Sequence, residues 1–322
     1  MEMSSPGSKF LGILNNENNE YTIVKELDFG GSSKVYEVLD NQARETKVAK
    51  IFDDDCEIEF EKEVSIFHTI QDLNCAIQML SYGKGFLSME DDEGFKNYII
   101  LEYGKGNLLQ YMDKLNKPFS PETALYLFYQ FIKDVNELHQ RCISHRDLKA
   151  ENVLLVGNNL SVKLCDFGLS KSFLNENNQK IKFKDSITIG SPFHYPPEIL
   201  ENKYYDGEKC DVYCAGITLF SLATRSFPFQ KATPNDGVYN MIYSNKIEHF
   251  WKYIDPDNLL SPQFRDLLVK MVAYNPKERI ALNKIFDEPY LARLRNPNEE
   301  TLAYFQNKVV SELGNINIYS SV

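Results

Sequence analysis

The chain has 322 residues, of which 43% are hydrophobic and 13% aromatic, and this composition excludes an intrinsically disordered chain. The length predicts two domains or one two-lobed unit. A formal net charge of −11 argues against non-specific binding to nucleic acid or to anionic lipid, because both need a basic surface.

Targeting signals and cysteine usage favour a cytoplasmic or nuclear protein. The first residues lack the basic and apolar regions of a secretory signal, and no apolar run approaches the length of a membrane span, so no membrane insertion is expected. The six cysteines are dispersed without a Cys-x-x-Cys pair, which predicts reduced thiols.

The first third of the chain is predicted to be mainly β-structure. Segments 21–27, 34–39, 46–52 and 98–101 are rich in β-branched and aromatic residues, with turn signals between them. One segment, from Cys56 to Ile70, has helical apolar spacing instead.

After Gly104 the pattern becomes helical. Ser120 and Pro121 are a helix start signal, and apolar residues recur behind them at helical spacing as far as Leu138. Ser261 and Pro262 repeat the same signal. We therefore predict an α+β chain in which a small β-rich lobe precedes a larger α-rich lobe.

The strongest chemical signal is the string HRDLKAEN from His145 to Asn152, followed by DFG from Asp166. Mg²⁺ takes oxygen ligands, so the carboxylate of Asp166 and the amide of Asn152 are candidate metal ligands. Asp147 would accept or orient the proton of an attacking hydroxyl, and Lys149 would face the transferred phosphate. A charged surface turn is disfavoured as the explanation, because this string with this spacing is improbable by chance.

With these motifs the chain resembles the eukaryotic protein kinases from about Tyr21 to Leu291. The resemblance implies a bilobal fold that binds ATP between its lobes. A five-stranded β N-lobe with one helix would span 21–103, and a helical C-lobe would span 104–291. Residues 1–20 would then be an N-terminal extension and 292–322 a C-terminal tail.

The resemblance also implies nucleotide contacts. Lys50 would pair with the α- and β-phosphates of ATP, and Glu63 would form an ion pair with that lysine. The adenine would lie among apolar side chains and the backbone of the connection between the lobes. These further expected contacts are Leu27, Val35, Val48, Leu101, Glu102, Gly104 and Leu154.

The glycine-rich loop departs from the family pattern. Gly30 keeps the central glycine and Gly31 follows it, but Asp28 and Ser33 replace the first and last glycines. A carboxylate near a triphosphate is unfavourable unless it points away or pairs with Lys34. This loop supports the alternative of a pseudokinase or scaffold that keeps the fold without useful catalysis, whereas the intact catalytic motifs favour an active enzyme.

Other matches indicate the substrate class. A lysine two residues after the catalytic aspartate, here Lys149 after Asp147, is typical of the serine/threonine-directed kinases. The chain therefore resembles the kinases that act on Ser and Thr hydroxyls of proteins. The resemblance implies that Glu198 pairs with Arg279 and that Asp211 braces the catalytic loop, and these matches separate protein kinases from kinases of small metabolites. The residues from Phe227 to Phe229 faintly resemble the calmodulin-dependent and AMP-activated group.

Regulation by phosphorylation is suggested by Arg146, beside Asp147. In kinases with this arginine, phosphate on the activation segment often satisfies its charge. Ser186 and Thr188 are the candidate sites, modified by an upstream kinase or by the chain itself, and the Ser191 hydroxyl would bridge Asp147 and Lys149. The alternation of lysines with apolar residues over 180–184 predicts either a solvated loop or a docking strand.

Overall fold

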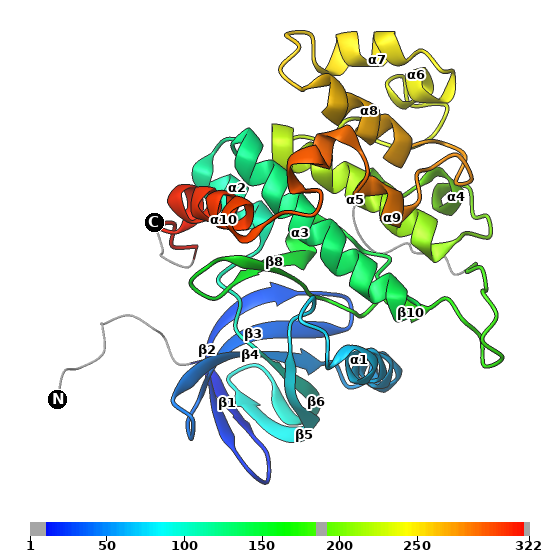
Figure 1. The fold of residues 1–322 in the computed structure, drawn as a ribbon. Helices are drawn as coiled ribbons and strands as arrows, with labels where there is room; N and C mark the ends of the chain where they lie inside the picture. Colours follow the sequence, from blue (N-terminus) through cyan, green and yellow to red (C-terminus); the bar gives the residue numbers. More distant parts are fainter. Residues whose placement is uncertain (1–10, 185–191, 319–322) are drawn as a thin grey trace. The chain divides into compact units, whose positions relative to one another are not determined.

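The computed structural model describes residues 11–184 and 192–318 (Figure 1). The chain divides into two compact units. The first unit runs to Asp72 and resumes from Ile77 to Tyr103, and the second contains Leu73–Ala76 and the chain from Gly104 onward.

The first unit is a closed antiparallel β-barrel with one helix, α1 (Glu57–Ile70). Its strand order is β1-β2-β3-β4-β6-β5. The strands are β1 (Gly12–Asn15), β2 (Glu20–Phe29), β3 (Ser33–Asp40), β4 (Glu45–Phe52), β5 (Met79–Met89) and β6 (Glu93–Leu101). The strands expected from β-branched and aromatic runs, and the helix expected up to Ile70, are confirmed.

The prediction of five strands is one strand short. Strand β1 lies in the segment that we expected to be an N-terminal extension, and it pairs with both β2 and β5. Leu14 is fully buried in the barrel core. Gly12 permits the close approach, because a Cβ there would lie 2.4 Å from the Ser88 carbonyl oxygen. Only four residues form this strand, too few for a clear alternating pattern.

Successive side chains along each strand point to opposite faces of the barrel sheet. The core contains Val38, Ala49 and Ile100, each at 0% exposure. Val48 and Lys50, the neighbours of Ala49 along β4, therefore belong to the opposite face. The sheet thus presents Lys50 on its outer side.

The second unit is mainly helical (Figure 1). Its helices are α2 (Leu108–Leu115), α3 (Pro121–Gln140), α4 (Pro197–Leu200), α5 (Gly207–Thr224), α6 (Tyr239–Tyr243), α7 (Ile247–Ile254), α8 (Pro262–Met271), α9 (Leu282–Ile285) and α10 (Glu299–Leu313). Short strands are β7 (Ile143–Ser144), β8 (Val153–Val156), β9 (Ser161–Leu164) and β10 (Lys171–Ser172), and 3₁₀ turns span Ala150–Asn152, Pro192–His194 and Pro289–Leu294.

Helices α3 and α5 pack together at the centre of this unit. Helix α3 begins where the start signal predicted, since the Ser120 hydroxyl accepts the Thr123 N–H and Pro121 is the first helical residue. Helix α5 is buried on nearly all sides from Cys210 to Leu222, which explains why most of its residues there are apolar. Both helices contact β7, the strand that leads into the turn described below.

Helix α10 also packs on α3. The Phe305 ring stacks on Tyr126 with ring centroids 5.7 Å apart. The Glu312 carboxylate accepts the Ser120 amide at 3.0 Å and the Ser120 hydroxyl at 2.6 Å. The C-terminal helix is thereby joined to the first turn of α3.

Within the described part of the chain, no helix combines the length and the apolar character needed to cross a bilayer.

Candidate active site

The turn between β7 and β8 is organised by a buried carboxylate, Asp211 of α5. Asp211 accepts the Ser144 hydroxyl at 2.9 Å and the amides of His145 and Arg146 at 2.9 and 2.8 Å. Although burial alone raises it, the bonds from His139 and the backbone hold the pKa of Asp211 below its ordinary value. The carboxylate is therefore charged and fixes a turn in which Arg146 has a φ of 69°.

Asp147 is hydrogen-bonded to two residues of the same turn. Lys149 Nζ lies 2.8 Å from Asp147 Oδ2, and the Asn152 side-chain nitrogen donates to this oxygen at 2.9 Å. Asn152 also donates to the Asp147 carbonyl at 2.8 Å. Although burial alone would lower it, the charges of Asp147, Glu151 and Asp166 raise the pKa of Lys149. The turn thus brings a carboxylate, an ammonium and an amide together.

Backbone contacts connect this turn to Asp166. His145 Nε2 lies 3.0 Å from the Cys165 carbonyl oxygen, and the Cys165 amide donates to the Asn152 carbonyl at 3.1 Å. Asp166 follows in a left-handed conformation with a φ of 59°. The two predicted metal ligands therefore come from adjoining pieces of chain.

The donor chemistry of Asn152 and Asp166 fits Mg²⁺. The Asn152 side-chain nitrogen is engaged with Asp147, so its side-chain oxygen is the candidate ligand atom. Mg²⁺ binds in proteins through one or two such oxygen donors, with water and substrate phosphates completing its shell. Over residues 11–184 and 192–318, no group of three or more His, Cys, Asp or Glu side chains could hold a metal. The two oxygen donors of Asn152 and Asp166 would leave the rest of a Mg²⁺ shell to water and phosphate.

In the first unit, Lys50 of β4 and Glu63 of α1 form an ion pair. Lys50 Nζ lies 2.8 Å from each oxygen of the Glu63 carboxylate. Lys50 and Glu63 are 7% and 2% exposed, so the pair is largely desolvated. The two residues come together as the resemblance implied.

Three expected adenine contacts share the outer face of the barrel with Lys50. Val35 faces Lys50 across β3 and β4, and Val48 faces Leu101 across β4 and β6. Directly opposed residues lie on one face, and so do residues two apart on a strand. Leu27 lies at an irregularity in the β2–β3 register and is half-buried.

The glycine-rich turn between β2 and β3 closes without the two missing glycines. The Gly30 amide donates to the Ser33 carbonyl at 2.8 Å, and Gly31 is exposed at the tip. The Asp28 carboxylate accepts the amide of its neighbour Phe29 at 2.8 Å. Ser33 is buried as the first residue of β3. The Asp28 side chain is thus engaged locally, which weakens the electrostatic objection raised by the sequence.

The remaining expected nucleotide contacts are Glu102, Gly104 and Leu154. In the first unit, the Glu102 amide donates to the Gln78 carbonyl at 2.9 Å, so its own carbonyl is the group suited to an adenine edge. In the second unit, Gly104 lies against Leu154, since a Cβ on Gly104 would be 3.1 Å from Leu154 Cδ1.

A second buried ion pair supports the helical unit. The Arg279 guanidinium donates to both oxygens of Glu198 at 2.6 Å, and Glu198 and Arg279 are 5% and 2% exposed. Arg279 also donates to the carbonyls of Ala273 and Lys209. The predicted pairing of Glu198 with Arg279 is confirmed.

Comparison with known families gives the family of the chain. The model of the protein kinase domain matches residues 21–291, which is most of the sequence. The chain belongs to the protein kinase family. The bilobal α+β fold expected from the motifs follows from this membership, apart from the strand count corrected above.

Three of the curated relatives are protein kinases of plants. Serine/threonine-protein kinase SAPK9 of Oryza sativa is 34% identical over 197 residues, covering 61% of this chain and 52% of the relative. Serine/threonine-protein kinase SRK2C of Arabidopsis thaliana is 35% identical over 192 residues, 58% of this chain and 52% of the relative. CBL-interacting protein kinase 26 of Oryza sativa is 31% identical over 281 residues, 83% of this chain and 51% of the relative.

The chain thus spans about half the length of the curated relatives it matches. The names of the first two support the serine/threonine branch that Lys149 indicated.

The candidate regulatory residues of this kinase are described only in part. Ser186, Thr188 and Ser191 lie outside the described residues. Arg146 is buried, with its guanidinium carbon 5.0 Å from the ring centroid of Phe183 and 5.8 Å from that of Tyr205. These two aromatic neighbours were not predicted. The alternation of Phe183 with lysines is the one sequence signal that could have drawn attention to it.

His194 is a second residue that sequence reasoning left without a role. Its imidazole is 5% exposed, and its Nδ1 atom has no hydrogen-bond partner. Burial lowers the pKa of His194 to about 4; nearby Asp147 raises it and Lys149 lowers it. The imidazole is therefore neutral close to the catalytic turn.

Proposed function

We propose that this chain is a serine/threonine protein kinase that transfers the γ-phosphoryl group of ATP to Ser and Thr hydroxyls of protein substrates. The observation that carries the proposal is the turn in which Lys149 and Asn152 both hydrogen-bond the Asp147 carboxylate. Phosphoryl transfer depends on positioning and charge neutralisation. Asp147 orients the attacking hydroxyl and accepts its proton, while Lys149 supplies positive charge to the transferred phosphate.

ATP and Mg²⁺ are the proposed cofactors. The ion would be held by Asn152 and Asp166, and it would neutralise phosphate oxygens when bound. Lys50, oriented by Glu63, pairs with the α- and β-phosphates. The further residues proposed to contact the nucleotide are Leu27, Gly30, Gly31, Val35, Val48, Leu101, Glu102, Gly104 and Leu154.

We also propose that phosphorylation of Ser186 or Thr188 regulates the enzyme, through an upstream kinase or through autophosphorylation. Arg146 and Lys171 are candidate partners for that phosphate, since both lie against the ring of Phe183, three residues before Ser186. Phosphate adds charge that arginine and lysine can pair with. The Ser191 hydroxyl would bridge Asp147 and Lys149.

Protein substrates are the proposed partners, with no role for nucleic acid. All six cysteines are thiols, which suits the reducing cytoplasm or nucleus proposed as the location. The net charge of −11 suits substrates with basic surfaces.

A pseudokinase or scaffold is the alternative that a specific observation favours. That observation is the replacement of two glycines by Asp28 and Ser33. Against it, Asp28 is engaged with the Phe29 amide, and Lys50, Glu63 and Asp147 retain their contacts.

A transfer assay with labelled ATP and a generic basic protein tests the proposal. Wild type should incorporate phosphate on Ser and Thr, while Asp147→Asn and Asp166→Ala should each lose at least about a hundredfold in rate. Asp257→Asn, at an exposed position, is the matched control and should retain full activity. An inert wild type that still binds a partner would favour the scaffold.

A further inference from the structure

Two aromatic residues meet where the segment after β10 returns to the start of α5. Phe183 and Tyr205 exchange backbone hydrogen bonds, each amide donating to the other carbonyl at 2.9 Å. Their ring centroids are 5.6 Å apart at an interplanar angle of 64°, and both residues are buried. We call these two residues the aromatic clamp.

Arg146 lies against both rings of the clamp, and Lys171 lies against one of them. The Arg146 guanidinium carbon lies 5.0 Å from the Phe183 centroid and 5.8 Å from the Tyr205 centroid. Lys171 Nζ lies 5.3 Å from the Phe183 centroid. A cation over an aromatic ring gains most when it is desolvated, as buried Arg146 is. The aromatic clamp therefore stabilises a buried positive charge directly beside Asp147 in the sequence.

Gly207, the first residue of α5, makes room for the clamp. A Cβ at this position would lie 2.7 Å from Phe183 Cε2 and 2.8 Å from the Ser144 hydroxyl oxygen. Since any larger residue would displace the Phe183 ring or Ser144, the absence of a side chain here is what lets the ring reach Arg146.

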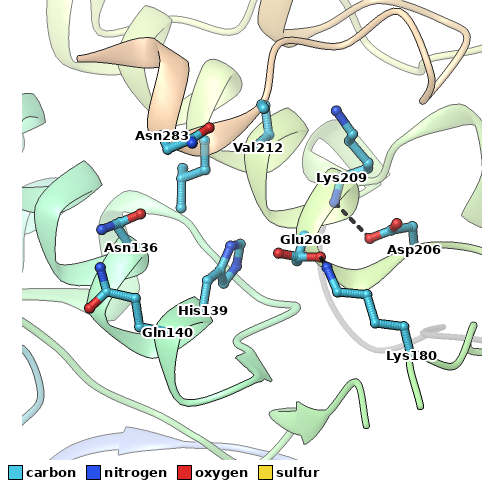
Figure 2. Close-up of a pocket in the computed structure, with 11 residues that line it drawn as sticks. Asn136, His139, Gln140, Lys180, Asp206, Glu208, Lys209, Val212 and Asn283 are labelled. Atoms are coloured by element: carbon cyan, nitrogen blue, oxygen red, sulfur yellow. Dashed lines mark hydrogen bonds and ion pairs between the residues drawn. The ribbon is translucent and has the colours of Figure 1, made fainter. Parts of the chain in front are cut away.

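Further contacts fasten the same segment to the start of α5. Lys180 lines a polar pocket of about 550 Å³, and Figure 2 shows its ammonium next to Glu208. Lys180 Nζ lies 2.5 Å from Glu208 Oε2, and Lys184 Nζ lies 5.0 Å from the Tyr204 centroid. The chain is thus attached on both sides of Phe183, before the candidate phosphorylation sites are reached.

We propose that the aromatic clamp of Phe183 and Tyr205 positions Arg146, and through it Asp147, without requiring phosphate on the activation segment. This inference rests on the proposed kinase reaction. Arg146 and Asp147 are consecutive, and the Arg146 amide is already held by Asp211 at 2.8 Å. The clamp fixes the side chain of Arg146 as Asp211 fixes its backbone, so both ends of the residue are restrained.

The clamp limits how much phosphorylation of the activation segment can raise kcat. Phosphate on Ser186 or Thr188 would act on a segment that is already attached as far as Lys184. A Ser186→Ala/Thr188→Ala protein should therefore keep at least about a third of the wild-type kcat. In that background, Phe183→Leu should lower kcat about tenfold while the KM for ATP changes by less than about twofold.

Matched variants separate the effect of the Phe183 ring on kcat from the effect of lost packing. Phe183→Leu keeps apolar bulk and removes the ring, whereas Tyr205→Phe keeps the ring. Phe250→Leu removes an equally buried ring from α7 and is the control for lost packing. We expect Tyr205→Phe and Phe250→Leu to stay within about twofold of the parent kcat. The inference is overturned if Phe183→Leu and Phe250→Leu have the same kcat, or if Tyr205→Phe falls as far as Phe183→Leu.

Hydrogen exchange tests the clamp independently of activity. In Phe183→Leu, the amides of Phe183, Tyr205 and Arg146 should exchange at least about tenfold faster than in the parent, and in Phe250→Leu they should not. Unchanged exchange at Arg146 in Phe183→Leu would overturn the inference. If the parent transfers no phosphate but the exchange pattern is as expected, the proposed kinase reaction fails and the clamp stands as a structural finding.

Discussion

At the scale of single residues, the stability of this protein depends strongly on how its buried charges are paired. The Lys50–Glu63 pair shows this dependence, because both oxygens of a carboxylate that is 2% exposed accept from one ammonium. Desolvation makes such a pair costly to form and more costly to break. Residue substitutions therefore have different effects on stability according to whether they remove one charge or both.

We predict that Lys50→Met lowers the free energy of unfolding by about 3 kcal/mol, since it leaves a buried carboxylate without its ammonium partner. The double variant Lys50→Met/Glu63→Leu should recover most of this loss while remaining unable to transfer phosphate. Urea unfolding of the two single variants and the double variant checks this. A double variant less stable than Lys50→Met would contradict it.

The buried imidazole of His194 predicts acid sensitivity. Burial lowers its pKa from an ordinary 6.5 to about 4, so between these values the unfolded chain binds the extra proton and the folded chain does not. Stability is therefore full above pH 6.5 and is lost as the pH falls toward 4. At pH 5 the buried His194 lowers the free energy of unfolding by about 2 kcal/mol relative to its value above pH 6.5.

His194→Gln should remove that part of the pH dependence. Thermal unfolding at pH 5 and pH 8 should show a smaller difference for His194→Gln than for wild type. His249→Gln, at an exposed site, is the control. An equal difference for wild type and His194→Gln would show that this imidazole is not the cause.

At the scale of elements, helix α3 carries an unusual N-terminal contact. Its cap, Ser120, is hydrogen-bonded to Glu312 of α10 as well as to Thr123 of its own first turn. Helix α8 has the same type of cap, Ser261, which accepts the Phe264 amide at 3.2 Å. The two caps form a natural pair for comparison.

We expect Ser261→Ala to lower the free energy of unfolding by about 1 kcal/mol and Ser120→Ala by about 2 kcal/mol, because the latter also loses the hydroxyl bond to a carboxylate. A cycle with Glu312→Ala should give a coupling of about 1 kcal/mol between Ser120 and Glu312. Denaturant unfolding of the set measures both values. Equal losses at the two serines would mean that the contact with α10 adds nothing.

Elements with strong local signals were predictable from the sequence. The hydroxyl and proline at Ser120 and Pro121 specify the first turn of α3 by themselves, and the helix ending at Ile70 has its own apolar spacing. Strand β1 was not predictable, because four residues carry little alternation and its partners, β2 and β5, lie at different distances along the chain.

The candidate site also has one part that was predictable from the sequence and one part that was not. Asp147, Lys149 and Asn152 lie in one short motif, so their proximity follows from the sequence. The contact of Arg146 with Phe183 and Tyr205 joins three separate segments. No local pattern encodes it, since it depends on how the chain returns to α5.

At the scale of the whole molecule, burial divides the six thiols into two classes. Cys75, Cys210 and Cys214 are buried, while the other three are partly exposed. Burial, assisted by Asp134, raises the pKa of Cys75. The hydrogen bond with Cys214, together with burial, raises the pKa of Cys210. A thiol with a raised pKa is a poor nucleophile because the thiolate is the reactive form.

Alkylation of the native protein should therefore label only the partly exposed class. We expect iodoacetamide at pH 7.5 to modify Cys56, Cys142 and Cys165 before the buried thiols, which should react only after denaturation. Peptide mass spectrometry after timed quenching measures the order. Early labelling of Cys75 or Cys210 in the folded protein would contradict the prediction.

The pairing of β1 with both β2 and β5 has a consequence for association between molecules. A sheet that ends in an unpaired strand offers backbone donors and acceptors on which a foreign strand can be added. In this barrel every strand has two hydrogen-bonded neighbours, so such a template is missing from the first unit. Assembly by strand addition would first require β1 to detach, and loss of Leu14 from the core would oppose that step.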